Sequence, residues 1–252
     1  MTIKFITNEP VAFIPEERAL VIAELHLGLE HELFKKGIII PPQRIKFQET
    51  LNIISKMTKA KILIILGDIK HKVPGITIRE ETEIPKLLEF LEEKFRVILV
   101  KGNHDAGVEE IIPKRIKIYG SRGFRLGKYG FFHGHAWPSK NLMKCDLLFM
   151  SHIHPCVEFR DRLGYKIIEQ VWVSGAINKE LVKKRYKIKK TGGLKIIILP
   201  TFNKLLGGLA INTTIEEDLI GPILKNKFLD INSCKLYLLD GTYIDIVKKL
   251  RA

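Results

Sequence analysis

Residues 61–71 read KILIILGDIKH, and the fold is predicted from this stretch and its repeats. An apolar run that stops at a glycine and an aspartate is typical of a buried strand followed by a turn. The pattern recurs at residues 19–28, ALVIAELHLG, and at residues 95–105, FRVILVKGNHD. In all three stretches a charged residue follows the apolar run, either directly or after one glycine. We therefore predict three strands whose carboxyl ends carry polar side chains.

Two amphipathic stretches separate these runs and predict helices. They are RIKFQETLNIISKM from Arg44 and IPKLLEFLEEKF from Ile84, where Pro85 suits a first helical turn. Strands that alternate with helices predict parallel βαβ units with right-handed crossovers.

The later part of the chain is richer in predicted strands. Apolar runs recur in YGFF, CDLLFM and LKIIIL, and two stretches are hairpin-like, RIKIYGSRGFRLGKYGFF (115–132) and KLYLLDGTYIDI (235–246). In the second, Asp240-Gly241 fits a two-residue turn. The sequence predicts a single mixed α/β domain over residues 1–252, in which residues 200–252 form an accessory cap or edge.

Composition narrows the class of protein. The 252 residues are 46% hydrophobic, which is enough to fill a core. A formal charge of +14 attracts polyanions and phosphorylated substrates, although a surface of ion-pair networks is an equally good explanation. Three cysteines without C-x-x-C spacing argue against a disulfide framework and a thiolate zinc site. Together with an N-terminus that lacks a signal peptide, they predict a cytoplasmic protein with no membrane partner.

Histidines and oxygen ligands gather where the apolar runs end. Seven of the eight histidines lie there: His26, His71, His104, His133, His135, His152 and His154. Glu24, Asp68, Asn103 and Asp105 occupy the same positions. Because the carboxyl ends of parallel strands meet at one edge of a sheet, we expect these side chains to converge. Imidazole and oxygen ligands together suit manganese, iron or zinc.

Each motif alone has an ordinary structural explanation. A glycine and an aspartate after a strand usually form a turn, and His152 and His154 are by themselves as consistent with half-buried strand-end residues as with ligands. Glu24 and His26 point the same way if the strand continues through them. The joint order of the five motifs along one chain, E-x-H, GD, GNHD, HGH and H-x-H, favours a metal site.

That order resembles the calcineurin-like metallophosphoesterase superfamily, whose D-x-H, GD, GNH-D/E, HGH and GHxH motifs correspond to residues 24–154. The stretches AELHLGLEHELFKKGIIIPP, GDIKH, HGHAWP, HIHP and LPTFNKLLGG resemble its ICC-like branch, found in archaea and related to bacterial DNA ligase-associated metallophosphoesterases. Two residues depart from the pattern: Glu24 replaces an aspartate and Ser151 replaces a glycine. The resemblance implies a four-layer αββα sandwich of two mixed β-sheets flanked by helices, with its motif core at residues 20–156.

The resemblance also implies two divalent metal ions, manganese before iron, zinc or nickel. Its ligand sets are Glu24, His26 and His154 for one ion and Asn103, His133 and His152 for the other, with Asp68 bridging both. His104 matches the catalytic histidine, Asp105 would orient it, and His71 and His135 would face the substrate or support the ligands. The longer Glu24 must order an extra torsion. Its site is therefore predicted to be the weaker one, and Glu24→Asp to tighten it.

Two adjacent cations lower the pKa of a shared water and stabilise an in-line displacement at phosphorus. The activity implied is hydrolysis of phosphate esters, with phosphodiesters of nucleotides or nucleic acid favoured by the basic charge. The alternatives are a phosphomonoesterase and a weakly active or non-catalytic metal-binding scaffold. The basic stretch KELVKKRYKIKK (179–190) is either a contact for a phosphate backbone or a solvated surface.

Overall fold

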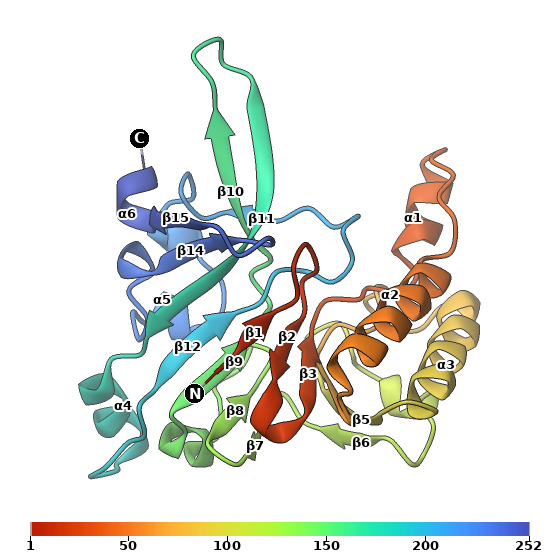
Figure 1. Ribbon diagram of the computed structural model, residues 1–252, viewed down its shortest axis with the longest axis horizontal. Coiled ribbons are helices and arrows are strands. Elements are labelled where there is room, and N and C mark those ends of the chain that lie inside the picture. Colours follow the sequence, from red (N-terminus) through yellow and green to blue (C-terminus); the bar gives the residue numbers. More distant parts are fainter. Residues whose placement is uncertain (1, 252) are drawn as a thin grey trace.

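Two β-sheets pack face to face in the computed structural model, which describes residues 2–251 (Figure 1). The first sheet has the order β1-β2-β3-β4-β5-β6, in which β3 to β6 are parallel and β1 and β2 are antiparallel. Its strands are β1 (Lys4–Phe5), β2 (Ala12–Ile14), β3 (Ala19–Ile22), β4 (Ile62–Leu66), β5 (Arg96–Val100) and β6 (Lys117–Tyr119). The three strands predicted from ALVI, KILIIL and FRVILV are β3, β4 and β5.

The second sheet has the order β13-β10-β11-β12-β9-β8-β7, and β14 and β15 join it through β11. Strands β8, β9 and β12 are parallel to one another, and β13 is parallel to β10. The pairs β7–β8, β10–β11, β11–β12, β11–β14 and β14–β15 are antiparallel. Its strands are β7 (Phe124–Leu126), β8 (Tyr129–Phe131), β9 (Leu147–Met150), β10 (Pro155–Arg160), β11 (Lys166–Ala176), β12 (Lys195–Ile198), β13 (Leu209–Ala210), β14 (Lys235–Leu238) and β15 (Tyr243–Ile246). Both sheets are therefore mixed, as predicted.

Helices cover the outer faces of both sheets. The α-helices are α1 (Leu29–Lys35), α2 (Gln43–Thr58), α3 (Ile78–Glu92), α4 (Lys179–Tyr186), α5 (Pro222–Lys225) and α6 (Val247–Leu250), and 3-10 turns occur at η1 (Pro15–Glu17), η2 (Val108–Glu110), η3 (Lys140–Lys144), η4 (Glu216–Asp218) and η5 (Ile231–Ser233). Helices α2 and α3 pack on the first sheet, and α4 to α6 pack on the second. Aromatic residues such as Phe131, Phe149 and Trp172 fill the space between the sheets. The αββα architecture is confirmed.

Helix α3 begins earlier than the sequence pattern predicted. Thr77 and Glu80 form a capping box, in which each side chain bonds to the backbone N–H of the other residue, so the helix begins at Ile78. Pro85 consequently lies inside the helix instead of in its first turn. An interior proline costs about 3 kcal/mol. Burial of Ile84, Leu87 and other apolar residues against the sheet offsets that cost.

Residues 115–132 were predicted as one hairpin-like unit, but the structure divides them between the sheets. Strand β6 is the edge of the first sheet, and only β7 and β8 form an antiparallel hairpin in the second. The division follows from packing, because Ile118 contacts the helix-covered core whereas Phe124 contacts the aromatic core between the sheets. Local alternation of apolar residues does not distinguish the two destinations.

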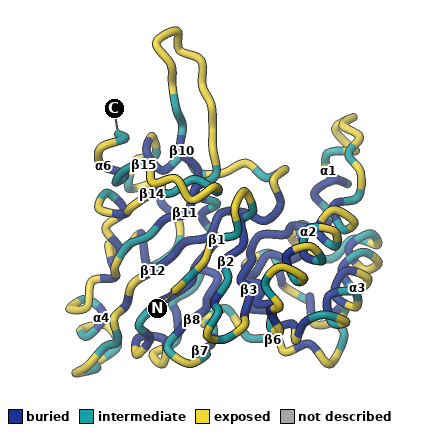
Figure 2. Tube along the Cα trace, in the orientation of Figure 1, coloured by how far each residue is buried: buried dark blue, intermediate teal, exposed yellow. Residues whose placement is uncertain are grey.

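The C-terminal segment completes the second sheet and shares its core, because Ile223, Leu229 and Leu236 pack in the same cluster as Val173. Strands β14 and β15 extend that sheet, joined by a turn in which Gly241 has a φ of 94°. The β10–β11 hairpin projects from the body, and its outer half is exposed (Figure 2). Among the described residues, no helix is both long and apolar enough to cross a membrane.

Candidate active site

The predicted site residues lie in the turns that follow β3, β4, β5, β8 and β9. Five of them adopt a left-handed backbone: Glu24 (φ 60°), His26 (43°), Asp68 (52°), His152 (75°) and His154 (46°). This conformation is uncommon for residues with a Cβ and costs about 1–3 kcal/mol each. Such strain persists where surrounding contacts hold the backbone, and it is concentrated at functional sites.

Glu24 and His26 converge, although not because they share a strand. Strand β3 ends at Ile22, and the following residues pair with the turn after β4. The N–H groups of Glu24 and His26 donate to the carbonyl oxygens of Gly67 and Asp68 at 3.1 and 2.8 Å. The two side chains therefore converge through this pairing, not through the strand alternation from which their common direction was predicted.

Two glycines allow the turns to approach one another. A Cβ on Gly67 would overlap the ring of His133 and the backbone of Gly102, and a Cβ on Gly102 would overlap the carboxylate of Asp68. Gly67 also has a φ of 81°, which side chains rarely adopt. The glycines of the GD and GNHD motifs are thus needed for close packing of the site.

The carboxylate of Glu24 is fully buried at the centre of the site. Its Oε2 lies 3.1 Å from Nε2 of His26 and 2.9 Å from Nε2 of His154. Its Oε1 accepts a hydrogen bond of 2.7 Å from the N–H of His152. The longer side chain is therefore already ordered by its neighbours. This removes the physical reason for expecting a weaker site at Glu24.

Asp68 lies between the two predicted ligand sets. Its Oδ2 is 3.7 Å from Nε2 of His26 and 3.4 Å from Nε2 of His133, and its Oδ1 accepts from the N–H of His104 at 2.8 Å. Nε2 of His133 is also 3.1 Å from Oδ1 of Asn103. Asp68 therefore lies within 4 Å of one histidine from each predicted ligand set.

Buried charges in the site stabilise one another. Burial raises the pKa of Glu24, but His133, His154 and His26 hold it well below its usual range. Burial alone lowers the pKa of His133, but Glu24 and Asp68 raise it to about 9. Two buried carboxylates attract cations, because removing a carboxylate from water is unfavourable without a positive partner.

Two other histidines of the rim have pKa values shifted in the direction opposite to that of His133. Burial, reinforced by His133, lowers the pKa of His152 and of His135 to about 4. Neutral imidazole is the form that binds metal. The ring of His135 packs against those of His133 and His152, and its Nδ1 is buried without a hydrogen-bond partner.

Asp105 was predicted to orient His104, but the structure gives its carboxylate a different role. It accepts hydrogen bonds from four backbone N–H groups, those of Asp68, Ile69, Lys70 and Gly102, at 2.8 to 3.4 Å. Asp105 therefore fixes the turns after β4 and β5 to each other. Burial and the neighbouring Asp68 raise the pKa of Asp105 to about 6.

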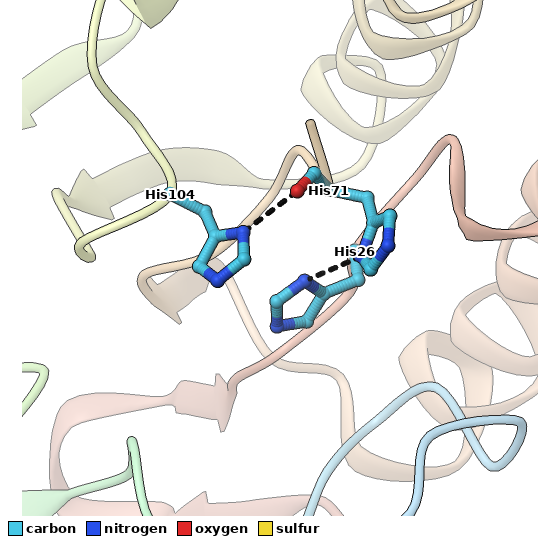
Figure 3. A group of neighbouring side chains, drawn as sticks. All are labelled: His26, His71 and His104. Carbon is cyan, nitrogen blue, oxygen red and sulfur yellow. Dashed lines mark hydrogen bonds between the residues drawn. The ribbon is translucent and has the colours of Figure 1, made fainter. Parts of the chain in front are cut away.

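His71, not Asp105, orients His104 (Figure 3). Nδ1 of His104 donates to the carbonyl oxygen of His71 at 2.7 Å, because a carbonyl can only accept. Nε2 of His104 is left to face the cavity that the residue lines. The ring of His71 points instead toward His26, with 3.2 Å between their Nδ1 atoms.

Ser151, which replaces a glycine of the resembled pattern, fits the site without disturbing it. Its hydroxyl donates to the carbonyl oxygen of Leu66 at 2.8 Å and lies 3.1 Å from Nδ1 of His133. Nδ1 of His133 also lies 2.8 Å from the oxygen of Leu66. Ser151 therefore packs behind a candidate ligand, away from the cavity.

Residues 201–209 form a part of the site that sequence reasoning did not assign. Phe202 and Asn203 donate backbone N–H groups to the carbonyl oxygens of Ala23 and Glu24, and the Asn203 amide donates to that of Leu25. The same loop supplies Gly207, Gly208 and Leu209 to the cavity wall. The stretch LPTFNKLLGG was noted only as part of a resemblance, although its asparagine and paired glycines were the available signal.

The donor set fits divalent metal ions. Three groups of side chains can converge on a cation: Glu24, His26 and His154; Glu24, Asp68 and His133; and His26, His71 and His104. The first two contain buried carboxylates and imidazoles, which suit manganese, iron or zinc. Asn103 and His152 line the same cavity of about 460 Å³. All seven predicted ligands are thus brought to one rim.

The basic segment lies in the outer layer beside the second sheet. Strand β11 runs antiparallel to β12, so α4 leaves from the end of the sheet opposite to the turn that carries His152. The guanidinium of Arg185 stacks 3.3 Å from the ring centroid of Trp137, and the hydroxyl of Tyr186 donates to Pro138. None of the residues from 179 to 190 lines the cavity at the site.

A family model described as calcineurin-like phosphoesterase matches residues 17–238. The chain belongs to this family. As a calcineurin-like phosphoesterase it is a phosphoester hydrolase, and the family implies divalent metal ions, for which the site provides suitable ligands. Comparison with curated protein sequences gives no match.

Two solved structures are similar to this calcineurin-like phosphoesterase. The nuclease MPE of Pseudomonas putida is 18% identical, with a TM-score of 0.57 over 92% of this chain and 89% of that one. The E. coli phosphoesterase Yfce is 22% identical, with a TM-score of 0.36 over 57% of this chain and 73% of that one. At an identity of 18%, the likeness to the nuclease MPE supports the fold alone.

Proposed function

We propose that the protein is a dinuclear metal-dependent phosphodiesterase that acts on nucleotides or nucleic acid. The observation that carries the proposal is the position of Asp68, whose Oδ2 lies between Nε2 of His26 and Nε2 of His133. One cation would be held by Glu24, His26 and His154, and the other by Asn103, His133 and His152, with Asp68 shared. Manganese is the first candidate metal, before iron, zinc and nickel.

When bound, the cations would supply Lewis acidity toward the phosphate and lower the pKa of water. The protein's own residues position the reaction. His104 holds Asp68 through its backbone N–H, and its ring is fixed by the His71 carbonyl with Nε2 free toward the cavity. In its protonated form, Nε2–H stabilises a phosphoryl oxygen or donates the proton to the leaving oxygen.

A diester is favoured over a monoester by the shape and charge of the surroundings. The cavity is open, and Gly207 and Gly208 contribute no side chains to its wall. The net charge of +14 attracts a polyanion. The P. putida relative is named a nuclease, which is consistent with a nucleic-acid substrate. A cytoplasmic location also remains a prediction from the sequence.

The non-catalytic scaffold is the weaker alternative. It rested on Glu24 and Ser151, the two departures from the resembled motifs. Glu24 nevertheless reaches both neighbouring histidines, and Ser151 sits behind His133 without entering the cavity. A scaffold would not need the ring of His104 to be held facing the cavity.

The test compares bis(p-nitrophenyl) phosphate with p-nitrophenyl phosphate, each with metal-free protein and with added manganese. We expect manganese-dependent turnover that is faster with the diester. Asp68→Asn, which keeps the shape of the side chain but removes its charge, should lose most of this activity and bind fewer than two ions. Faster turnover of the monoester would replace the diesterase with a monoesterase, and metal binding without turnover of either ester would favour the scaffold.

A further inference from the structure

His71 joins helix α1 to the candidate metal site. Its Nε2 lies 2.9 Å from Oε2 of Glu32, which is on α1, and its Nδ1 lies 3.2 Å from Nδ1 of His26. Figure 3 shows this contact between the two imidazole rings, whose planes are inclined by 67°. Glu32 was not among the residues predicted from the sequence, and it lies six positions after His26 at the surface.

The polarity of this chain of hydrogen bonds is set at its outer end. Hydrogen bonds from Lys36 and His71 lower the pKa of Glu32 to about 2, so its carboxylate only accepts. His71 must then donate from Nε2, and a neutral His71 ring has its lone pair on Nδ1. Without a cation, Nε2 of His26 faces the Glu24 carboxylate as a donor. When a cation takes the lone pair of Nε2, the proton of His26 is on Nδ1, which then donates to the lone pair of His71.

We propose that Glu32 and His71 are a positioning pair that fixes the tautomer and ring orientation of His26 for cation binding. The proposal rests on the metal site assigned under the proposed function. An imidazole ligand whose second nitrogen donates to a carboxylate, directly or through another group, is held in place and made more basic. Here the ring of His71 transmits the effect of Glu32, and its carbonyl orients His104.

A purely structural role predicts a different result. The Glu32 carboxyl group is about half exposed, and its contacts with Lys36 and His71 are surface interactions that contribute little to stability. Removing Glu32 should therefore leave folding almost unchanged. Loss of such an outer partner typically weakens metal affinity by about 10- to 100-fold. Metal affinity and thermal stability thus distinguish positioning from structural support.

The experiment titrates metal-free protein with manganese chloride by calorimetry in the wild type, Glu32→Ala, Glu32→Gln and Lys36→Ala. We expect Glu32→Ala to weaken one of two manganese sites by about tenfold or more. Glu32→Gln should lose less, because its amide oxygen still accepts from Nε2 of His71. Lys36→Ala is the matched control: it removes the other partner of Glu32 and should bind manganese like the wild type.

Nitrogen-15 NMR of the histidine rings in zinc-loaded protein gives a second readout that does not depend on activity. In the wild type, Nδ1 of His26 should carry a proton and Nδ1 of His71 should not. In Glu32→Ala this pattern should be lost or averaged. Wild-type manganese affinity or an unchanged ring pattern in Glu32→Ala would overturn the positioning pair. A wild type that binds no manganese would instead refute the proposed function itself.

Discussion

Replacement of Glu24 by aspartate tests whether the pocket is built for the longer side chain. Oε1 of Glu24 is 2.7 Å from the N–H nitrogen of His152, and Oε2 is 3.1 and 2.9 Å from Nε2 of His26 and His154. The removal of one methylene withdraws the carboxylate by about 1–1.5 Å. Glu24→Asp therefore cannot keep all three contacts, and we expect it to weaken metal binding, which reverses the expectation from sequence.

The magnitude follows from these contacts. The bond to His152 would lengthen to roughly 4 Å, beyond hydrogen-bonding distance, and a poorly hydrated N–H left unpaired costs about 1–3 kcal/mol. The lost methylene contributes about 0.8 kcal/mol more. Aspartate adopts a left-handed backbone more readily, which offsets a small part of the loss. The free energy of unfolding should fall by about 2–3 kcal/mol, and metal affinity should fall about tenfold or more.

Calorimetric titration with manganese, elemental analysis and urea unfolding measure these effects. Glu24→Gln is the control for side-chain length, because it keeps an acceptor for the His152 N–H but loses the charge. It should lose less stability than Glu24→Asp and still bind metal poorly. If Glu24→Asp bound manganese as tightly as the wild type, or more tightly, the pocket would have relaxed around the shorter side chain. That result would refute the geometric reasoning.

Three further predictions address other parts of the molecule. His104→Asn should lower turnover of a diester by about 10² or more while the metal content stays unchanged, and a wild-type rate would remove His104 from the mechanism. Asp105→Ala leaves four backbone N–H groups without their acceptor, so urea unfolding should show a loss of at least ~4 kcal/mol; a loss below about 1 kcal/mol would contradict this role. Alanine at Lys183, Lys184 and Arg185 should flatten the salt dependence of nucleic-acid binding without changing turnover of a small diester, and equal salt slopes would mean that this surface is merely solvated.

Much of the fold and most of the candidate site follow from local sequence. Strands of a parallel sheet are buried on both faces, so β3, β4 and β5 appear as unbroken apolar runs that can be recognised without a structure. The polar residues that end these runs converge because parallel strands bring their carboxyl ends to one edge. Asp68 and Asn103 could therefore be placed at one site from the sequence.

Tertiary structure decided the contacts between residues that are distant in sequence. Ile118 and Phe124 belong to similar local patterns, and only packing assigns one to the helix-covered core and the other to the core between the sheets. The carboxylate of Glu24 is ordered by a backbone N–H 128 positions away, and Glu32 reaches His71 across 39 positions. A hydrogen bond requires the donor and acceptor to be placed to within a few tenths of an ångström and to be well aligned. Such geometry exists only after the sheets and turns have packed, so sequence spacing alone could not predict it.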